Sequence, residues 1–364
     1  MNYKRLGNYI REVNVRNRDL KVTNLLGVSI SKEFMPSIAN TIGTDMSAYK
    51  IVERGQFAYG PVTSRNGDKV SIALLDGYDD AIISQAYTVF EVIDHEQLLP
   101  EYLMMWFRRP EFDRYARFHS HGSAREVFDW DELCEVMLPI PSISRQREIV
   151  SEHETLTNRI CLNEQMIQKL EATAQALYRK MFVDDIDKDN LLEGWRIRML
   201  KEIAMIKAGG DKPIDFSEQK TKDYNIPIYA NGIEQKGLFG YTNKPIIEKK
   251  SITISARGTI GYCFLRKQPY VPIVRLIVVI PMHEMETQYL YYYLNSSNIK
   301  GSGSVQGQLT VPDIERKEII IPPHEIVSEF DDKVEIIDEA IAILEKENVI
   351  LTKLQSLLLA KMGQ

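Results

Sequence analysis

Five polar stretches of this sequence combine Arg, Lys, Asn or Gln with Gly or Ser, a composition that suits contact with DNA. Arg and Lys pair with guanine in the major groove, and Asn and Gln pair with adenine. Phosphate groups are bound by cations and by backbone N–H groups of turns. The stretches span residues 63–69, 120–125, 229–236, 255–259 and 304–308. The candidate DNA-contacting residues within them are Thr63, Arg65, Asn66, Lys69, Ser123, Arg125, Asn231, Lys236, Ser255, Arg257, Thr259, Gln306 and Gln308.

Each of these stretches also has an ordinary structural interpretation. Residues 63–69 could form a polar hairpin between two apolar strands, and residues 229–236 could form a simple turn. Residues 120–125 and 304–308 occupy matching places in the chain and could be solvated loops. The stretch 255–259 favours a functional role most, because an Arg beside Gly recurs at the same position of an internal repeat.

Motifs for catalysis are missing from the sequence. The Pro322-Pro323 pair follows isoleucine, so it does not form the (D/N)PP(Y/F) motif of adenine methyltransferases. Glycine-rich loops of the GxGxxG or GxxxxGK(S/T) type, which hold phosphates of cofactors or nucleotides, are absent. Glu248-x-Lys250 lacks the acidic partner of a nuclease core, and the His119-x-His121 pair is not expected to bind metal. The sequence predicts a protein that is not an enzyme and uses no cofactor or metal.

The net charge of −6 does not exclude DNA as a partner, because the acidic residues are concentrated in two segments. Residues 324–364 hold nine Asp or Glu against four Lys, and residues 183–195 hold five against one, which leaves +3 on the rest of the chain. No apolar run approaches the roughly 20 residues that span a membrane, and the N-terminus lacks the apolar segment of a secretory signal. Three widely separated cysteines fit a cytoplasmic location.

An internal repeat divides the chain into two similar halves. Four pairs of segments recur in the same order, for which chance is a poor explanation. The last pair shares an apolar strand, proline and an identical EIVSE, and each copy leads into a helical stretch that ends in Lys-Met. The pairs are 5–13 with 199–207, 57–73 with 252–266, 101–107 with 288–294, and 137–152 with 319–329.

Short strands and Gly or Asn turns with one or two helices in each globular half predict an α+β class without βαβ alternation. The acidic stretch before Trp195 indicates an exposed linker. We expect a first globular domain at 1–143, a helix at 144–182, a linker at 183–194, a second domain at 195–323 and a second helix at 324–364.

Both predicted helices carry the 4-3 spacing of a coiled-coil seam. Asn163 and Asn348 each interrupt one seam, either as a tolerated polar residue or as a selector of register. If the first helix leaves domain 1 and enters domain 2, the second must return antiparallel, and ~37 residues at about 1.5 Å each give a rod of roughly 55 Å. The first seam is Ile149, His153, Leu156, Ile160, Asn163, Ile167, Leu170, Ala174, Leu177 and Met181; the second is Ile326, Phe330, Val334, Ile337, Ile341, Leu344, Asn348, Leu351 and Leu358.

This arrangement resembles the specificity subunits of type I restriction-modification systems over essentially the whole chain. The resemblance rests on the duplicated junctions, on KLEATAQALYRKMF at 169–182, on WRIRMLKEIA at 195–204, and on GSGSVQGQLTVPDIERKEIIIPP at 301–323. Residues 121–141, which close the first domain, differ in detail: they have Arg and an acidic pair where the second domain has Gln-Gly-Gln. Such a difference fits two domains that read different sequences.

The resemblance implies that each globular half is a target-recognition domain that reads one part of a bipartite site on double-stranded DNA. It also implies two domains related by pseudo-two-fold symmetry, separated by an antiparallel two-helix coiled coil. The helices would dock two modification (methyltransferase) subunits, restriction (motor and nuclease) subunits would join them, and no membrane would be involved. The alternative is a non-catalytic coiled-coil assembly scaffold without DNA specificity. DNA binding that weakens with salt would distinguish the two.

Overall fold

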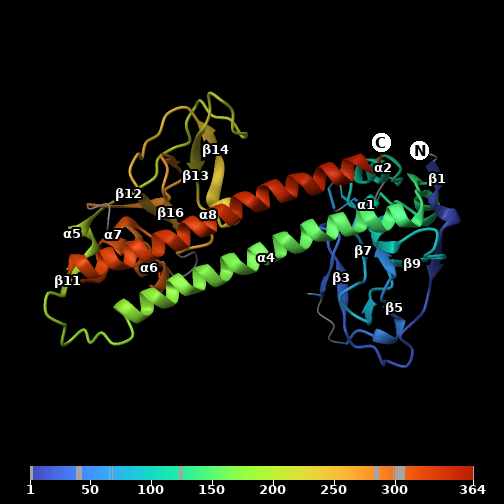
Figure 1. Cartoon of the computed structure of the whole chain (residues 1–364), viewed down its shortest axis with the longest axis horizontal. Coiled ribbons are helices and arrows are strands. Elements are labelled where there is room, and N and C mark those ends of the chain that lie inside the picture. Colours follow the sequence, from blue (N-terminus) through green and yellow to red (C-terminus); the bar gives the residue numbers. More distant parts are fainter. Residues whose placement is uncertain are drawn as a thin grey trace. The chain divides into compact units, whose positions relative to one another are not determined.

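The chain forms two compact units (Figure 1). Unit 1 comprises Met1–Asn163 and Lys346–Gln364, and unit 2 comprises Glu164–Glu345. Unit 1 is therefore assembled from two separate pieces of the chain, whereas unit 2 is continuous. Strands and helices occur in both, which confirms the α+β class. The computed structural model describes residues 3–37, 43–64, 66–67, 69–122, 126–282, 287–297, 299 and 308–363.

An antiparallel sheet buried on both faces forms the centre of unit 1. Its strand order is β2 (Ile10–Val13), β9 (Thr88–Val92), β6 (Phe57–Tyr59) and β7 (Ile72–Leu74). Because side chains alternate along a strand, Phe57 and Tyr59 enter one apolar core while Ala58 enters another. Phe57 stacks on Phe90 with ring centroids 4.8 Å apart.

Helices cover one face of this sheet and short strand pairs cover the other. Pro100 occupies the first turn of helix α1 (Pro100–Phe107), where its missing N–H costs nothing. The residues of α1 other than Glu101 are buried. The further elements of unit 1 are α2 (Pro110–Phe118), α3 (Trp130–Cys134), the pair β3 (Leu26–Val28) and β4 (Phe34–Pro36), the pair β5 (Lys50–Glu53) and β8 (Asp80–Ile83), and the 3-10 turns η1 (Leu6–Asn8) and η2 (Met46–Ala48).

Unit 2 repeats the central sheet and its helix. The strand order is β12 (Ala204–Ala208), β18 (Ile277–Pro281), β15 (Ser251–Ile254) and β16 (Cys263–Arg266), again antiparallel throughout, and α6 (Thr287–Ser296) follows β18 as α1 follows β9. The predicted duplication is confirmed. The accessory strands differ, because β13 (Ile226–Tyr229) pairs antiparallel with β14 (Leu238–Thr242) and parallel with β17 (Val271–Pro272).

A small sheet closes each globular part at the start of a long helix. In unit 1, β1 (Tyr3–Arg5) pairs with β10 (Met137–Pro139), and the Tyr102 hydroxyl donates to the Pro139 carbonyl at 3.0 Å. In unit 2, β11 (Arg196–Met199) pairs with β19 (Glu318–Ile321), and the Tyr289 hydroxyl donates to the Ile320 carbonyl at 2.5 Å. The short helices α5 (Leu200–Ile203) and α7 (Val311–Glu315) complete this end of unit 2.

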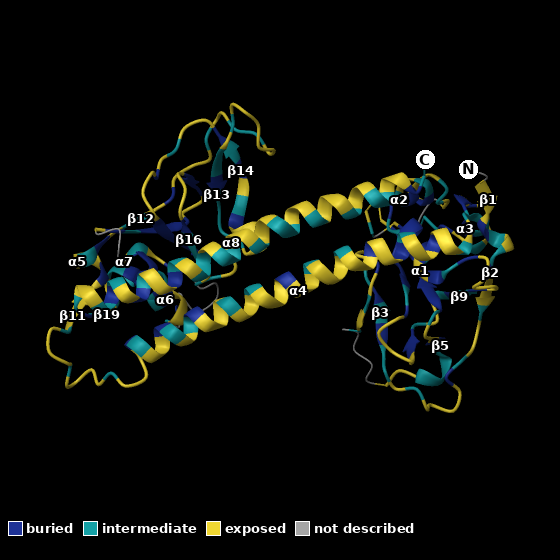
Figure 2. Ribbon diagram, viewed as in Figure 1, coloured by how far each residue is buried: buried dark blue, intermediate teal, exposed yellow. Residues whose placement is uncertain are grey.

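The long helices are α4 (Ile143–Phe182) and α8 (His324–Lys361), and each contributes residues to both units. In unit 1 they run antiparallel, since Arg159 pairs with Glu347 at 2.9 Å while Thr157, earlier in α4, accepts from Gln355, later in α8. In unit 2 the rings of Phe182 and Phe330 lie 5.2 Å apart. Every residue of both predicted seams is buried or half-buried, which confirms the coiled-coil pattern (Figure 2).

The last turn of α8 completes the core of unit 1. Met362 is buried there, and Leu358 and Leu359 pack against the same cluster. The Tyr3 hydroxyl donates to the Gly363 carbonyl at 2.8 Å, so β1 and the end of α8 are directly bonded. No helix within the described part of the chain is long and apolar enough to cross a membrane.

Candidate nucleic-acid interface

The connection between β15 and β16 in unit 2 presents exposed polar side chains. Arg257 and Thr259 are exposed, whereas Ser255 at the start of the connection is buried. Gly258 and Gly261 have φ of 68° and 88°, the left-handed region that glycine adopts without strain. Among the described residues, no hydrogen bond or ion pair engages the Arg257 side chain. This arginine is therefore available to an outside partner.

Asn231 fastens the neighbouring loops instead of extending to solvent. Its Oδ1 accepts from the Ala256 N–H at 2.7 Å, and its Nδ2 donates to the Val274 carbonyl at 2.8 Å. The Ser255 hydroxyl accepts from the Gly232 N–H at 3.2 Å. The polar atoms of Asn231 and Ser255 position the loops in this structure, and direct contact of either residue with DNA stays a prediction.

Lys236 is held against the long helix. Its Nζ lies 2.9 Å from the Glu345 carboxylate of α8, and its carbonyl accepts from Arg266 at 2.6 Å. Arg266 is itself buried with its guanidinium 3.5 Å from the centre of the Tyr229 ring. Lys236 belongs to the 3-10 turn η3 (Glu234–Gly237) and has φ of 56°. Lys236 is thus a partner of Glu345 in this structure, and a phosphate would have to compete for it.

The segment that leads into α7 lies beside the Arg257 loop. The Leu309 N–H donates to the Ala256 carbonyl at 3.0 Å, and the Leu309 side chain is buried. This bond places the half-buried Gln308 next to the loop. Gln306 lies outside the described residues.

Unit 1 builds the corresponding loops in the same way. The Phe128 N–H donates to the Pro61 carbonyl at 2.9 Å, and the Phe128 side chain is buried like that of Leu309. Two segments of each unit therefore come together although they are far apart in the sequence: the loop after β6 or β15, and the segment before α3 or α7.

Among the predicted residues of unit 1, Thr63 is buried, and its hydroxyl donates to Ser120 at 3.0 Å. This hydroxyl fastens the loop, and direct contact of Thr63 with DNA stays a prediction. Asn66 is half-buried with its amide on the Val62 carbonyl at 3.3 Å, and Lys69 is exposed. The predicted residues that lie outside the described part of unit 1 are Arg65, Ser123 and Arg125.

The loop after β6 and the loop after β15 each border a concavity. In unit 2 the concavity is lined by residues 230–234, 237–239 and Thr259. In unit 1 it is lined by residues 60–62, Asn66, Ser71, Ala86 and Tyr87. The run Tyr291–Tyr293 does not contribute, because Tyr292 is buried in the core of unit 2 near Tyr178, with ring centroids 6.1 Å apart.

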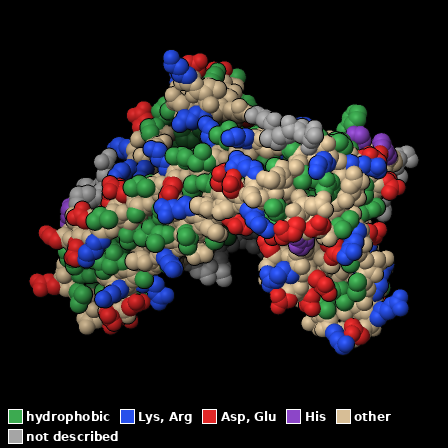
Figure 3. Space-filling view, turned by 45° about the vertical axis from the view of Figure 1, so that its right-hand side comes forward, with side chains coloured by type: hydrophobic (Ala, Val, Ile, Leu, Met, Phe, Trp, Pro, Cys, Tyr) green, Lys and Arg blue, Asp and Glu red, His purple; other side chains and the backbone are tan. Residues whose placement is uncertain are grey.

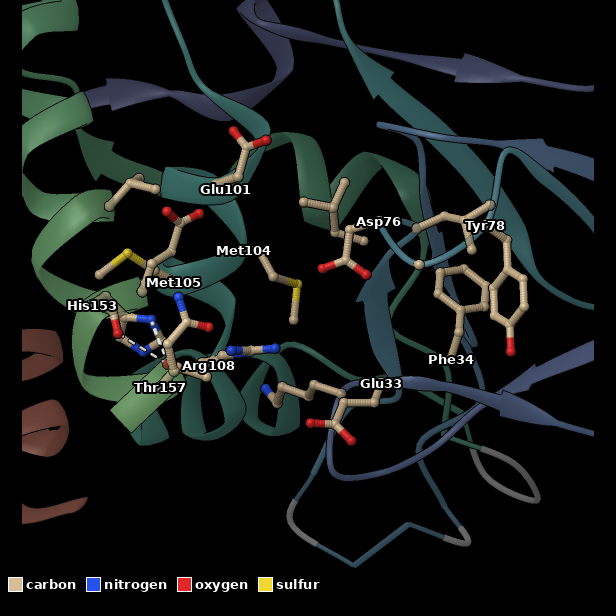
Figure 4. A pocket seen from close by; sticks show the side chains of 17 residues that line it. Glu33, Phe34, Asp76, Tyr78, Glu101, Met104, Met105, Arg108, His153 and Thr157 are labelled. Carbon is tan, nitrogen blue, oxygen red and sulfur yellow. Dashed lines mark hydrogen bonds between the residues drawn. The ribbon is translucent and has the colours of Figure 1, made fainter. Parts of the chain in front are cut away.

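A separate cavity of about 560 Å³ in unit 1 lies between α1 and α4 (Figure 4). Burial and the nearby Arg108 lower the pKa of His153, which keeps this histidine neutral near pH 7. Acidic side chains outnumber the two cations, so the cavity does not suit a phosphate group. The charged residues of the lining are Lys32, Arg108, Glu33, Asp76, Glu101 and Glu154.

Charges of both signs are interspersed on the molecular surface shown in Figure 3, without one continuous basic area on that face. His119 and His121 lie 3.1 and 3.6 Å from the Glu132 carboxylate. Within the described residues, no group of three or more His, Cys, Asp or Glu could hold a metal ion.

The chain has two similar globular parts, each with exposed polar residues on its loops, and both contain parts of the same two antiparallel helices. These features are those of a two-domain binding protein. Residues 192–353 match the family model of the type I restriction modification DNA specificity domain. A Mycoplasma pneumoniae protein named as a type I specificity subunit is 32% identical over 231 residues, 58% of this chain and 68% of the relative. A second from the same organism is 39% identical over 208 residues, 56% of this chain and 55% of the relative.

The fold is also that of a solved specificity subunit. The chain superposes on the crystal structure of the S subunit of a type I restriction-modification system from M. genitalium with a TM-score of 0.60 at 15% sequence identity. The alignment covers 100% of this chain and 96% of the M. genitalium chain. The chain belongs to the family of type I restriction-modification specificity subunits.

Proposed function

We propose that this chain recognises a bipartite sequence on double-stranded DNA, with one half-site read by residues 1–143 and the other by residues 195–323. The observation that carries this proposal is the recurrence, in both units, of a polar loop bonded to the segment that precedes α3 or α7. Two similar surfaces with different side chains suit two different half-sites. Arg257, Thr259 and Gln308 are the candidate readers in unit 2, and Asn66 and Lys69 in unit 1.

Specificity subunits are the non-catalytic recognition components of type I complexes, which assemble with methyltransferase and restriction subunits. Catalysis therefore belongs to the partners. Two docked modification subunits would act at the two half-sites, and a cytoplasmic location would give them access to the chromosome.

The surface of α8 supports helix docking. Four apolar residues recur at intervals of seven in the sequence of α8 and are more than half exposed, two of them in unit 2 (Ile336 at 69%, Ile343 at 67%) and two in unit 1 (Ile350 at 54%, Leu357 at 57%). Exposed apolar residues at heptad spacing are costly in water and indicate a partner helix. We assign these residues to the modification subunits.

Electrophoretic mobility shift with the modification subunits present tests the function. A duplex carrying the sequence methylated in cells that contain the system should bind, and binding should weaken between low and moderate salt. A complex that forms with the modification subunits but retains no preference for this duplex over unrelated DNA would support the scaffold instead.

A further inference from the structure

From the geometry of unit 2 we infer that the turn Ile273–Leu276 is a second DNA-reading element, with Arg275 as its base-contacting residue. This inference rests on the proposed function of unit 2 as a recognition domain. The composition of this turn gives no signal for a turn or for a DNA contact. Its residues, Ile-Val-Arg-Leu, contain none of the Gly, Asn, Asp or Pro that mark turns.

The turn has an unfavourable backbone conformation. Val274 and Arg275 have φ of 52° and 59°, and the Leu276 N–H closes the turn onto the Ile273 carbonyl at 3.1 Å. Positive φ at both central residues is the geometry for which Asn-Gly is preferred. A β-branched residue there places its Cβ against the backbone and is a genuine outlier.

The surroundings impose this conformation through the backbone. Asn231 Nδ2 donates to the Val274 carbonyl at 2.8 Å, and the N–H groups of Val274 and Arg275 donate to the carbonyls of Gly210 and Gly209 at 2.9 and 3.2 Å. Gly209 permits the approach, since a Cβ there would lie 2.7 Å from the Pro272 carbonyl oxygen. The turn is consequently fixed and not free to relax.

The strain brings no compensating burial. Val274 is 48% exposed and Arg275 is exposed, so neither side chain contributes to the core. In the described part of the chain, no hydrogen bond or ion pair engages the Arg275 side chain. Strained backbone that is fixed by its neighbours and presents unengaged side chains indicates a functional constraint.

Asn231 joins this turn to the Arg257 loop. One side-chain amide bonds both Val274 and Ala256, and Ala256 directly precedes Arg257. Two exposed arginines thus lie on adjoining loops, while Lys236 on the third loop is occupied by Glu345. The planar fork of Arg matches O6 and N7 of guanine, so this surface suits a half-site that contains guanine.

Unit 1 has a turn in the same place. Residues 84–87 lead into β9 as residues 273–276 lead into β18, and the Tyr87 N–H closes the turn onto the Ser84 carbonyl at 3.1 Å. Ala86 and Tyr87 line the concavity beside the first loop. Gln85 and Ala86 are both exposed in this turn, and of the two only Gln85 carries a polar side chain, which pairs with adenine and not guanine. The two turns would therefore read different bases.

The test measures half-site discrimination by the complete complex with its modification subunits. The probe is the duplex defined by methylome sequencing, compared with duplexes that each change one base pair of the unit 2 half-site. Arg275→Ala should reduce discrimination at one base pair roughly 10- to 100-fold and leave the other half-site unchanged. Arg275→Lys, which keeps the charge and can still donate to guanine but lacks the planar fork, should give a smaller loss at the same base pair.

A paired substitution separates reading from folding. Val274→Asn with Arg275→Gly supplies the preferred turn residues, so thermal stability should be equal or higher while discrimination falls as in Arg275→Ala. Arg198→Ala, at an exposed arginine of β11 paired with Glu202, is the matched control and should leave discrimination unchanged.

Unchanged discrimination in both the Arg275→Ala and the Arg275→Lys variant would overturn the inference. An equal loss of affinity for every DNA sequence would also overturn it, because Arg275 would then contact phosphate and not a base. Failure of the unaltered complex to prefer the methylated sequence would instead reject the proposed function. The failure of the proposed function can be distinguished from the failure of the inference, because the sequence preference of the unaltered complex is measured before any substitution is made.

Discussion

Asn163 of α4 donates from its Nδ2 to the Oδ1 of Asn348 of α8 at 2.8 Å, so the two seam asparagines meet each other. The Asn163 amide also donates to Glu347 at 3.1 Å, and Asn163 is only 3% exposed. A polar pair within an apolar seam is satisfied in one register only, since a shift of either helix separates the partners. This contact favours register selection over a merely tolerated polar residue.

Substitution of one member of this pair should therefore destabilise unit 1. Asn163→Ala leaves the Asn348 amide without its partner, and we expect a loss of about 1–3 kcal/mol in the free energy of unfolding. The double variant Asn163→Leu with Asn348→Leu should recover stability but lose the unique register. Urea denaturation of Asn163→Leu, Asn348→Leu and the double Leu variant measures the coupling, and strictly additive effects of the two single changes would contradict it.

The pH dependence of unit 2 should contain a contribution from Asp331. Burial, followed by repulsion from Asp332 and Glu335, raises the pKa of this carboxyl group to about 7, against 3.8 when unfolded. The folded state then binds the proton more tightly, so this contribution is fully present below pH 4 and is lost as pH rises towards 7.

Asp331→Asn removes this titration. The variant should be more stable than the unaltered protein at pH 8, by roughly 1 kcal/mol after allowance for solvent screening. The difference should disappear near pH 4, where the aspartic acid is protonated. Thermal melts across this range provide the measurement, and a constant difference at every pH would show that Asp331 does not titrate in the folded protein over this interval.

Arg257 should act on one half-site only. Arg257→Ala is expected to weaken specific binding by about 1–3 kcal/mol if the guanidinium pairs with guanine. Competition binding with duplexes altered in either half separates the possibilities. Equal weakening on all DNA would assign Arg257 to phosphate, and unaltered binding would leave it a structural residue.

The length of the helices should set the spacing of the half-sites. Duplicating Leu170–Thr173 adds four residues, nearly one helical turn, which is ~6 Å along α4 and shifts the seam little. Since a base pair occupies about 3.4 Å, the preferred spacer should lengthen by one or two base pairs with both half-site sequences retained. Methylome sequencing of cells carrying the insertion reads the spacer directly. A fixed spacer would mean that the added turn bulges out of the helix.

The long-range pattern of the fold could be predicted from the sequence, because seams and repeats are periodic. The 4-3 spacing of apolar residues on either side of Asn163 predicted that this residue is buried and that it occupies a seam position, as Asn348 does in the other helix. The duplication identified the equivalent strands β6 and β15. The accessory strands were less predictable. The strand β13 pairs with β17, which lies more than 40 residues later in the chain, and no local pattern indicates such a distant pairing.

Individual site residues were harder to predict for a physical reason. Asn and Ser bind bases with the same groups that they use to fasten turns, so composition does not separate the two roles. Asn231 and Ser255 fasten loops, and the partners that occupy them come from distant segments. Arg275 was missed for the converse reason, because its turn is imposed by Gly209 and Asn231 and not by its own residues.

The division of unit 1 into two pieces has a consequence for synthesis on the ribosome. Unit 2 is continuous and can fold as soon as Glu345 has emerged, although its residues are made after the first piece of unit 1. The first piece must wait for residues 346–363, which bring Met362 into its core and bond Gly363 to Tyr3. The domain translated first is therefore finished last, and until then its unfilled apolar surface is exposed to chaperones and proteases.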